Sequence, residues 1–174
     1  YVAGNVIFIF CFGYRSDESL LVKKFLLEKK GIRLGEAADP FTLVIARASR
    51  YYSSRDSKKG IRYLTGEYDM IRERSLGQFY LARFYQMAKE WTSAGTHYRL
   101  ALDLHGGKDR LPHDGLLWEC YHGLGICCAM TGKVKESADL FAASLELARA
   151  LKKDALVASS CYDLSCSHAV LKNL

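Results

Sequence analysis

The residues with the strongest potential for chemistry are six cysteines and five histidines. Cys127, Cys161, Cys166 and His168 could converge on a zinc ion, because thiolates and imidazoles are its preferred ligands. The chain nevertheless lacks a CxxC pair and the other short ligand spacings of zinc sites. With 174 residues it is also long enough to fold without disulfide staples. We therefore expect reduced, mostly buried thiols, no metal site, and a reducing intracellular compartment, either the cytoplasm or an organelle matrix reached with a removed leader.

Motifs of the common nucleotide-binding and hydrolytic enzymes are absent from the sequence. Gly106-Gly107-Lys108 has neither the upstream strand nor the following Ser or Thr of a phosphate-binding loop. Neither a GxSxG elbow nor an HExxH helix occurs. Three histidines lie near residues 105–115 without a surrounding pattern of cysteines or carboxylates. We therefore expect no catalytic residues, no cofactor and no enzymatic activity.

Positive charge is concentrated in the N-terminal third. Residues 1–62 hold 12 of the 25 Lys and Arg but only 6 of the 19 Asp and Glu. Such a surplus is typical of a face that docks nucleic acid, an anionic membrane or an acidic protein, although a solvated face is the simpler explanation. The densest stretch contains one acid, Asp56, and forms a basic patch of Arg47, Arg50, Arg55, Lys58, Lys59 and Arg62.

The composition indicates a folded, helical protein. Hydrophobic residues make up 49% of the chain, which excludes disorder, and two prolines are too few for a turn-rich all-β fold. The longest apolar run, Val6–Phe12, is too short to span a membrane. Residues 2–12 suit a buried strand, but no partner strand is apparent, so we expect a short buried helix; a truncated membrane anchor is the alternative.

Helix signals predict the order of the elements. Asp39-Pro40 starts a helix strongly, and Thr131-Gly132 separates two others. The segment at 105–115, which contains three glycines and a proline, predicts a long loop. With the segment at 2–12, we expect an all-α chain of about 8–9 helices, at about 17–30, 40–53, 57–71, 76–89, 92–104, 115–130, 134–151 and 154–171.

Two windows, 78–104 and 121–147, share a spacing of small and large residues. In each, a small residue is followed by another small residue twelve positions later, then a large ring, then a further small residue. Small residues let neighbouring helices approach closely, and large side chains fill the space between them. The two sets are Ala82, Ala94, Tyr98 and Ala101, and Gly125, Ser137, Phe141 and Ser144.

This spacing resembles the tetratricopeptide repeat family over about residues 78–147. The sequence departs from the family pattern at Gln78 and Tyr121, where a tryptophan is frequent, and in lacking the closing proline. Because the repeat explains their spacing, we place the large residues in the core rather than in an aromatic ligand site. These core residues are Trp91, Tyr98, Trp118, Tyr121, Cys128 and Phe141.

The resemblance implies a right-handed α-solenoid of antiparallel helix hairpins, in one domain covering residues 1–174. The central repeats are expected at 75–104 and 115–151. The remaining segments are an N-terminal hairpin or docking segment at 1–36, a degenerate repeat at 39–71, and a capping or truncated-repeat helix at 154–172.

In this family the first helix of each unit lines a concave groove that binds partner segments. The Lys/Asn clamp that some members use for a C-terminal carboxylate is absent, which argues against a chaperone-tail adaptor. The groove is mixed, with one central arginine, and suits a helix or an extended segment with an acidic residue. The resemblance assigns to it Ser49, Tyr52, Phe79, Arg83, Gln86, Met87, His122, Ile126 and Met130.

These features predict a non-enzymatic protein–protein interaction scaffold, as a subunit or adaptor within a larger assembly. One alternative is a nucleic-acid-associated helical repeat that uses the basic patch, whose only interleaved aromatics are Tyr51, Tyr52 and Tyr63. Another is the peptide-sensing repeat domain of a regulator.

Overall fold

The computed structural model describes residues 40–105, 111 and 114–172. Within these residues the chain is all-α, with eight helices and no strand, which confirms that part of the predicted fold class. The expectations for residues 1–36 lie outside the described part. The helices are α3 (Pro40–Ser53), α4 (Ser57–Gly66), α5 (Tyr68–Ile71), α6 (Ser75–Met87), α7 (Trp91–His105), α8 (Asp114–Met130), α9 (Val134–Ala150) and α10 (Asp154–Leu171).

The single helix expected at 57–71 is wrong, because the chain breaks at Glu67 between α4 and α5. Helix α4 ends at Gly66, and the Glu67 N–H donates there to the Tyr63 carbonyl at 3.1 Å. The break lets Ile71 bury completely against α6, where an added Cβ on Gly77 would lie 2.5 Å from the Ile71 Cβ. Gln78 then donates hydrogen bonds of 3.2 Å to the carbonyls of Ile71 and Arg72. The buried amide of Gln78 therefore holds the end of α5.

Four turns between successive helices have the same backbone geometry. In the turn after α8, Gly132 N–H donates to the Ala129 carbonyl at 3.1 Å, and Lys133 N–H donates to the Cys128 carbonyl at 2.8 Å. This pattern requires a left-handed residue just beyond the helix, the position at which helices commonly end. Equivalent bonds close the turns after α3, α6 and α9. The left-handed residues are Arg55, Lys89, Gly132 and Lys152, with φ of 56°, 61°, 78° and 54°.

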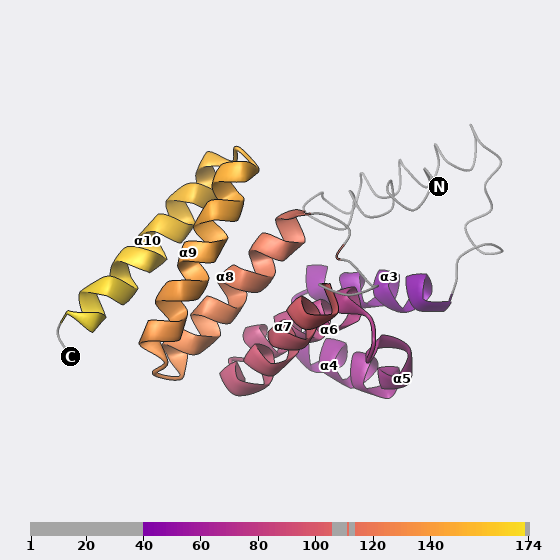
Figure 1. Ribbon diagram of the computed structural model, residues 1–174. Coiled ribbons are helices and arrows are strands. Elements are labelled where there is room, and N and C mark those ends of the chain that lie inside the picture. Colours follow the sequence, from indigo (N-terminus) through magenta and orange to yellow (C-terminus); the bar gives the residue numbers. More distant parts are fainter. Residues whose placement is uncertain (1–39, 106–110, 112–113, 173–174) are drawn as a thin grey trace.

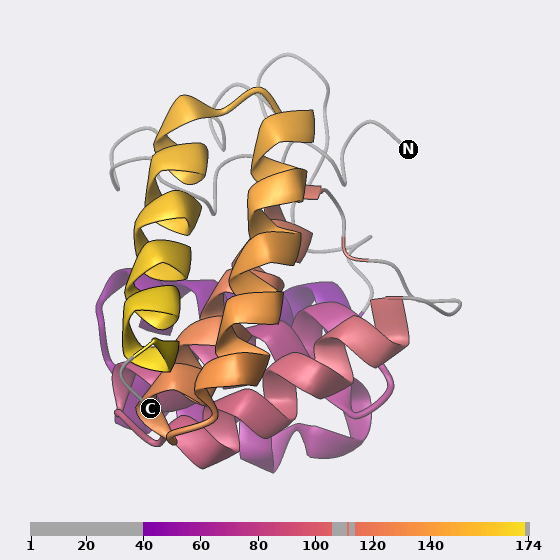
Figure 2. The ribbon, with the colours of Figure 1, turned by 60° about the vertical axis from the view of Figure 1, so that its left-hand side comes forward.

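The helices from α6 onward pack mainly on their neighbours in sequence, α6 on α7, α7 on α8, α8 on α9, and α9 on α10. Figure 1 shows the same order in space, from α3–α5 at one end of the molecule to α10 at the other. In Figure 2, α9 (orange) and α10 (yellow) lie side by side and are joined by a short turn. Helix α6 also contacts α3, α4 and α8, so it lies at the centre of the described part.

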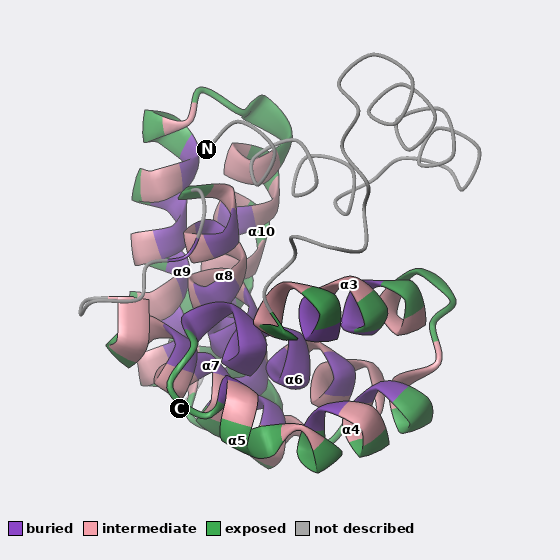
Figure 3. Cartoon of the chain, turned by 90° about the vertical axis from the view of Figure 1, so that its right-hand side faces the viewer, coloured by how far each residue is buried: buried purple, intermediate pink, exposed green. Residues whose placement is uncertain are grey.

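The core lies between the helices, where the buried stretches of neighbouring helices lie on their inner sides (Figure 3). Tyr98, Trp118, Phe141 and Cys128 are buried as predicted. Trp91 is only half-buried because it is the first residue of α7 and lies next to solvent. Tyr121, also expected in the core, is half-buried as well.

Candidate partner-binding site

Arg83 on α6 is the centre of a polar cluster that joins three helices. Its Nη2 donates a hydrogen bond to Tyr52 Oη on α3, and its guanidinium lies 5.2 Å from the Tyr52 ring centroid. Its Nη1 donates to Gln86 Oε1 at 3.4 Å and lies 3.8 Å from Glu119 Oε2 on α8. The structure therefore brings together Tyr52, Arg83 and Gln86, three of the residues expected in the groove, with Glu119 beside them.

Tyr98 on α7 contacts this cluster from the protein interior. Its side chain is fully buried, and its hydroxyl donates to Gln86 Oε1 at 2.6 Å. Gly123 on α8 gives the ring its space, because an added Cβ there would lie 2.5 Å from Tyr98 Cζ. Gln86 Oε1 thus accepts hydrogen bonds from both Arg83 and Tyr98.

The cluster contains a cation and a carboxylate in a site that is largely removed from water. The side chains of Arg83 and Glu119 are 26% and 23% exposed. Burial acts to lower the pKa of Arg83, but Tyr98, Tyr52 and Glu119 more than offset this, so the net pKa is raised. Burial raises the pKa of Glu119, and Arg83 offsets part of that rise. Arg83 is therefore a permanent cation whose counter-ion is built into the fold.

His122 forms a second polar contact, between α8 and α10. Its Nε2 lies 2.8 Å from Asp163 Oδ2 and 3.3 Å from Ser159 Oγ, and its ring stacks on Trp118 with centroids 4.6 Å apart. Burial lowers the pKa of His122, and Asp163 opposes this shift. A hydrolytic triad needs the serine and the carboxylate on opposite ring nitrogens. Here both contact the same nitrogen, so this group is arranged to hold α10 against α8.

Buried serines join α9 to α10 and α8. Ser144 and Ser160 hydroxyls lie 2.9 Å apart, and Trp118 Nε1 donates to Ser160 at 3.1 Å. Ser137 donates to the Gly125 carbonyl at 2.9 Å, so this predicted small position also makes a polar contact across the hairpin. The only buried side chains of α10 are Ser160 and Ser167, and both hydroxyls take part in hydrogen bonds.

The nine residues expected in the groove differ in their access to a partner. Ser49 and Phe79 are 6% and 1% exposed, so they belong to the core beneath the surface and cannot contact a partner as predicted. Met130 is 57% exposed. The half-buried members are Tyr52, Arg83, Gln86, Met87, His122 and Ile126.

Sequence reasoning missed Glu119 and Asp163. Glu119 precedes His122 by three residues, so the two share a face of α8, and this spacing could have revealed it. No spacing within α10 predicts a role for Asp163. Its contact with His122 depends on how α10 packs against α8. The accessible site therefore has a charge-balanced polar centre with the apolar side chains of Ile126, Met87 and Met130 on the same helices.

The remaining candidates for chemistry do not form a site within the described residues. Cys120, Cys127, Cys128, Cys161 and Cys166 are free thiols, of which the first three are buried. Among the described His, Cys, Asp and Glu, no group of three or more is placed to hold a metal ion. Burial raises the pKa of Cys127 to about 12, so this thiol is protonated at neutral pH and is a poor nucleophile.

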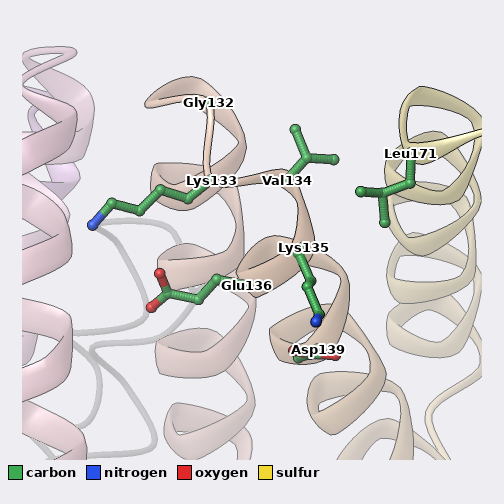
Figure 4. Close-up of a pocket in the computed structure, with 7 residues that line it drawn as sticks. All are labelled: Gly132, Lys133, Val134, Lys135, Glu136, Asp139 and Leu171. Carbon is green, nitrogen blue, oxygen red and sulfur yellow. The ribbon is translucent and has the colours of Figure 1, made fainter. Parts of the chain in front are cut away.

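A surface hollow lies between the start of α9 and the end of α10, where Val134 and Leu171 face each other (Figure 4). Its remaining lining is Gly132, Lys133, Lys135, Glu136 and Asp139, and both lysines are exposed. A solvated lining of this kind is typical of a helix–turn junction rather than of a catalytic site, where perturbed titratable groups gather in a cleft.

No family model matches the chain, and a search of curated proteins finds no match. Across the described helices, none combines the length and the apolar composition needed to cross a bilayer. The geometry of the site is therefore the basis of the functional assignment.

Proposed function

We propose that this chain is a non-enzymatic, tetratricopeptide-like helical-repeat module, with its hairpins stacked as a right-handed α-solenoid. It acts as a protein–protein interaction scaffold, as a subunit or adaptor of a larger assembly. The partner segment binds along the faces of α3, α6 and α8 that we call the first-helix strip. The strip consists of Tyr52, Arg83, Gln86, Met87, Glu119, His122, Ile126 and Met130.

The observation that carries this proposal is the Arg83 cluster. One guanidinium contacts Tyr52 of α3 and Glu119 of α8 from its own position on α6. Side chains of the three helices α3, α6 and α8 therefore meet on one surface, as they do where the first helices of stacked hairpins line a common face. The shared geometry of the four turns supports the same stacking.

The chemistry of the strip favours a partner segment with apolar side chains. Arg83 already has Glu119 as counter-ion, so an acidic partner residue would have to compete with that carboxylate. Met130 and Met87 offer flexible thioether side chains that adapt to different apolar shapes. We therefore expect a helix or an extended segment that buries apolar residues on Met130 and Ile126, with at most one acidic residue near Arg83.

Charge introduced into the strip should weaken binding of a partner segment. Twelve-residue peptides selected from a random display library on the immobilised chain provide the probe. We expect Met130→Asp to weaken the affinity of such peptides by about tenfold or more, because the new carboxylate would lose water in an apolar contact. Isothermal titration calorimetry with purified variants measures this loss.

Ala142→Asp is the matched control, because Ala142 is exposed on α9 and lies outside the strip. This variant should bind the same peptides within about twofold of the unmodified chain, in keeping with the small effect of a distant surface charge. Equal weakening by both substitutions, or unchanged binding by Met130→Asp, would place the site elsewhere. Far-ultraviolet circular dichroism shows that each variant is folded.

A further inference from the structure

A second surface, on the hairpin of α3 and α4, combines tyrosine rings with cations. The Arg47 guanidinium lies 5.0 Å from the Tyr63 ring centroid. The Tyr51 and Tyr63 rings lie 5.7 Å apart and are tilted by 60°. The hydrogen bond that Arg47 donates to the Tyr51 side chain raises the pKa of Arg47. Lys59 precedes Tyr63 by four residues, so it occupies the same face of α4.

Further cations flank these rings. Arg50 follows Arg47 by one helical turn, and Arg62 lies one helical turn from both Lys58 and Lys59. All of them are exposed, and Figure 3 shows exposed positions along the outer sides of α3 and α4. We call this surface the basic–aromatic face; it consists of Arg47, Arg50, Tyr51, Lys58, Lys59, Arg62 and Tyr63.

The face is separate from the first-helix strip. Tyr51 and Tyr52 are consecutive in α3, and the first packs on Tyr63 of α4 whereas the second contacts Arg83 of α6. Successive helical residues point about 100° apart, so the two tyrosines serve different surfaces. A ligand on one face therefore leaves the other open.

The combination of rings and cations selects among polyanionic partners. An anionic lipid surface or an acidic protein would engage the cations and leave the rings unused. A single nucleic-acid strand uses both, because its phosphates pair with Lys and Arg while its unpaired bases stack on aromatic rings. A duplex hides the faces of its bases inside the stack. Asp56 offsets one of these positive charges, through its 2.9 Å ion pair with Lys59.

We propose that the basic–aromatic face binds single-stranded nucleic acid, with phosphates on the cations and bases stacked on Tyr51 and Tyr63. Each stacked base contributes to affinity independently of its identity, so binding is tolerant of sequence. Phosphate contacts make binding weaken steeply as salt concentration rises.

Fluorescence anisotropy with labelled twelve-nucleotide oligo(U) and oligo(dT) tests the phosphate contacts, in a potassium chloride series. We expect the triple variant Arg50→Gln, Lys58→Gln and Arg62→Gln to bind about tenfold more weakly at low salt. The slope of log affinity against log salt should fall by about two, since each single-strand phosphate contact contributes about 0.7. A preference between the two oligonucleotides distinguishes an RNA from a DNA ligand.

The matched control removes the same amount of charge from exposed lysines at the other end of the molecule. Lys133→Gln, Lys135→Gln and Lys152→Gln should leave both the affinity and the salt slope nearly unchanged. Equal weakening by the two triple variants would show attraction by net charge alone and would overturn the proposal.

Substitution of the rings separates nucleic acid from other polyanions. Tyr51→Leu and Tyr63→Leu should each weaken binding on the order of tenfold, the loss of one base stack, whereas Tyr51→Phe retains most of the affinity. Leucine variants that bind like the unmodified chain would contradict the proposal. So would equally tight binding of a duplex or of phosphatidylserine vesicles. Met130→Asp, which tests the first-helix strip, should not alter oligonucleotide binding.

Discussion

Gly123→Ala is expected to lower the free energy of unfolding by about 3 kcal/mol, from overpacking together with a lost buried hydrogen bond. The added methyl group would lie 2.5 Å from Tyr98 Cζ and 2.7 Å from Tyr98 Oη, closer than atoms can approach. Tyr98 is fully buried and cannot move toward solvent. Its displacement would also break the 2.6 Å hydrogen bond to Gln86. Urea denaturation followed by circular dichroism measures the change.

Gly66→Ala is the control for this substitution, because an added Cβ at the end of α4 meets no atom within 4 Å. Its effect should be a stabilisation of at most about 1 kcal/mol, through reduced freedom of the unfolded chain. In a Tyr98→Leu background the further cost of Gly123→Ala should fall below about 1 kcal/mol, since the ring is gone. Additive costs in the double variant would show that the clash with Tyr98 is not the cause.

Arg83→Met should destabilise the chain by about 2–3 kcal/mol near neutral pH, less than for a fully buried ion pair that loses one partner. The substitution removes the donor to Tyr52 and leaves the Glu119 carboxylate without its cation. Burial already raises the pKa of Glu119 above its ordinary value, and loss of Arg83 removes the effect that opposes this rise. The native state of the variant therefore binds a proton on Glu119 more readily than the unfolded chain does.

The cost of Arg83→Met should consequently depend on pH. When a carboxyl group has a raised pKa in the native state, stability falls as pH rises above the unfolded pKa and recovers as pH falls. The loss of unfolding free energy relative to the unmodified chain should be largest near pH 7. It should be smaller near pH 4, where Glu119 is protonated. Urea titrations at both pH values measure it. Glu119→Gln added to Arg83→Met should recover about half of the loss near pH 7, and no recovery would exclude Glu119 as its source.

The helical part of the fold follows from local signals in the sequence. Asp39-Pro40 and Thr131-Gly132 mark helix boundaries that the structure places at the start of α3 and at the turn before α9. The spacing of small and large residues correctly predicts that Tyr98 and Phe141 are buried. The break at Glu67 was not predictable in the same way, because it is favoured by the burial of Ile71 against α6, a contact distant from the break itself.

The candidate site was predictable only in outline. The register of the proposed repeat indicates Arg83 and its neighbours on α6, since these share one helix. The partners of Arg83 on α3 and α8 depend on the distance and rotation between helices, which spacing within a helix does not specify. Phe79 is a similar case. The register of the proposed repeat assigns it to the groove, but the packing around α6 buries it.

The central claim is that a partner segment binds on the first-helix strip, and the three methionines of the chain report on it directly. Met87 and Met130 belong to the strip, whereas Met70 lies in α5 and packs against the core. Carbon-13 labelling of the methionine methyl groups gives one signal for each, assigned by single Met→Leu variants. On titration with a selected peptide, we expect the Met87 and Met130 signals to shift while the Met70 signal stays in place. Peptide binding that shifts only Met70, or leaves both strip methionines unchanged, would contradict the account.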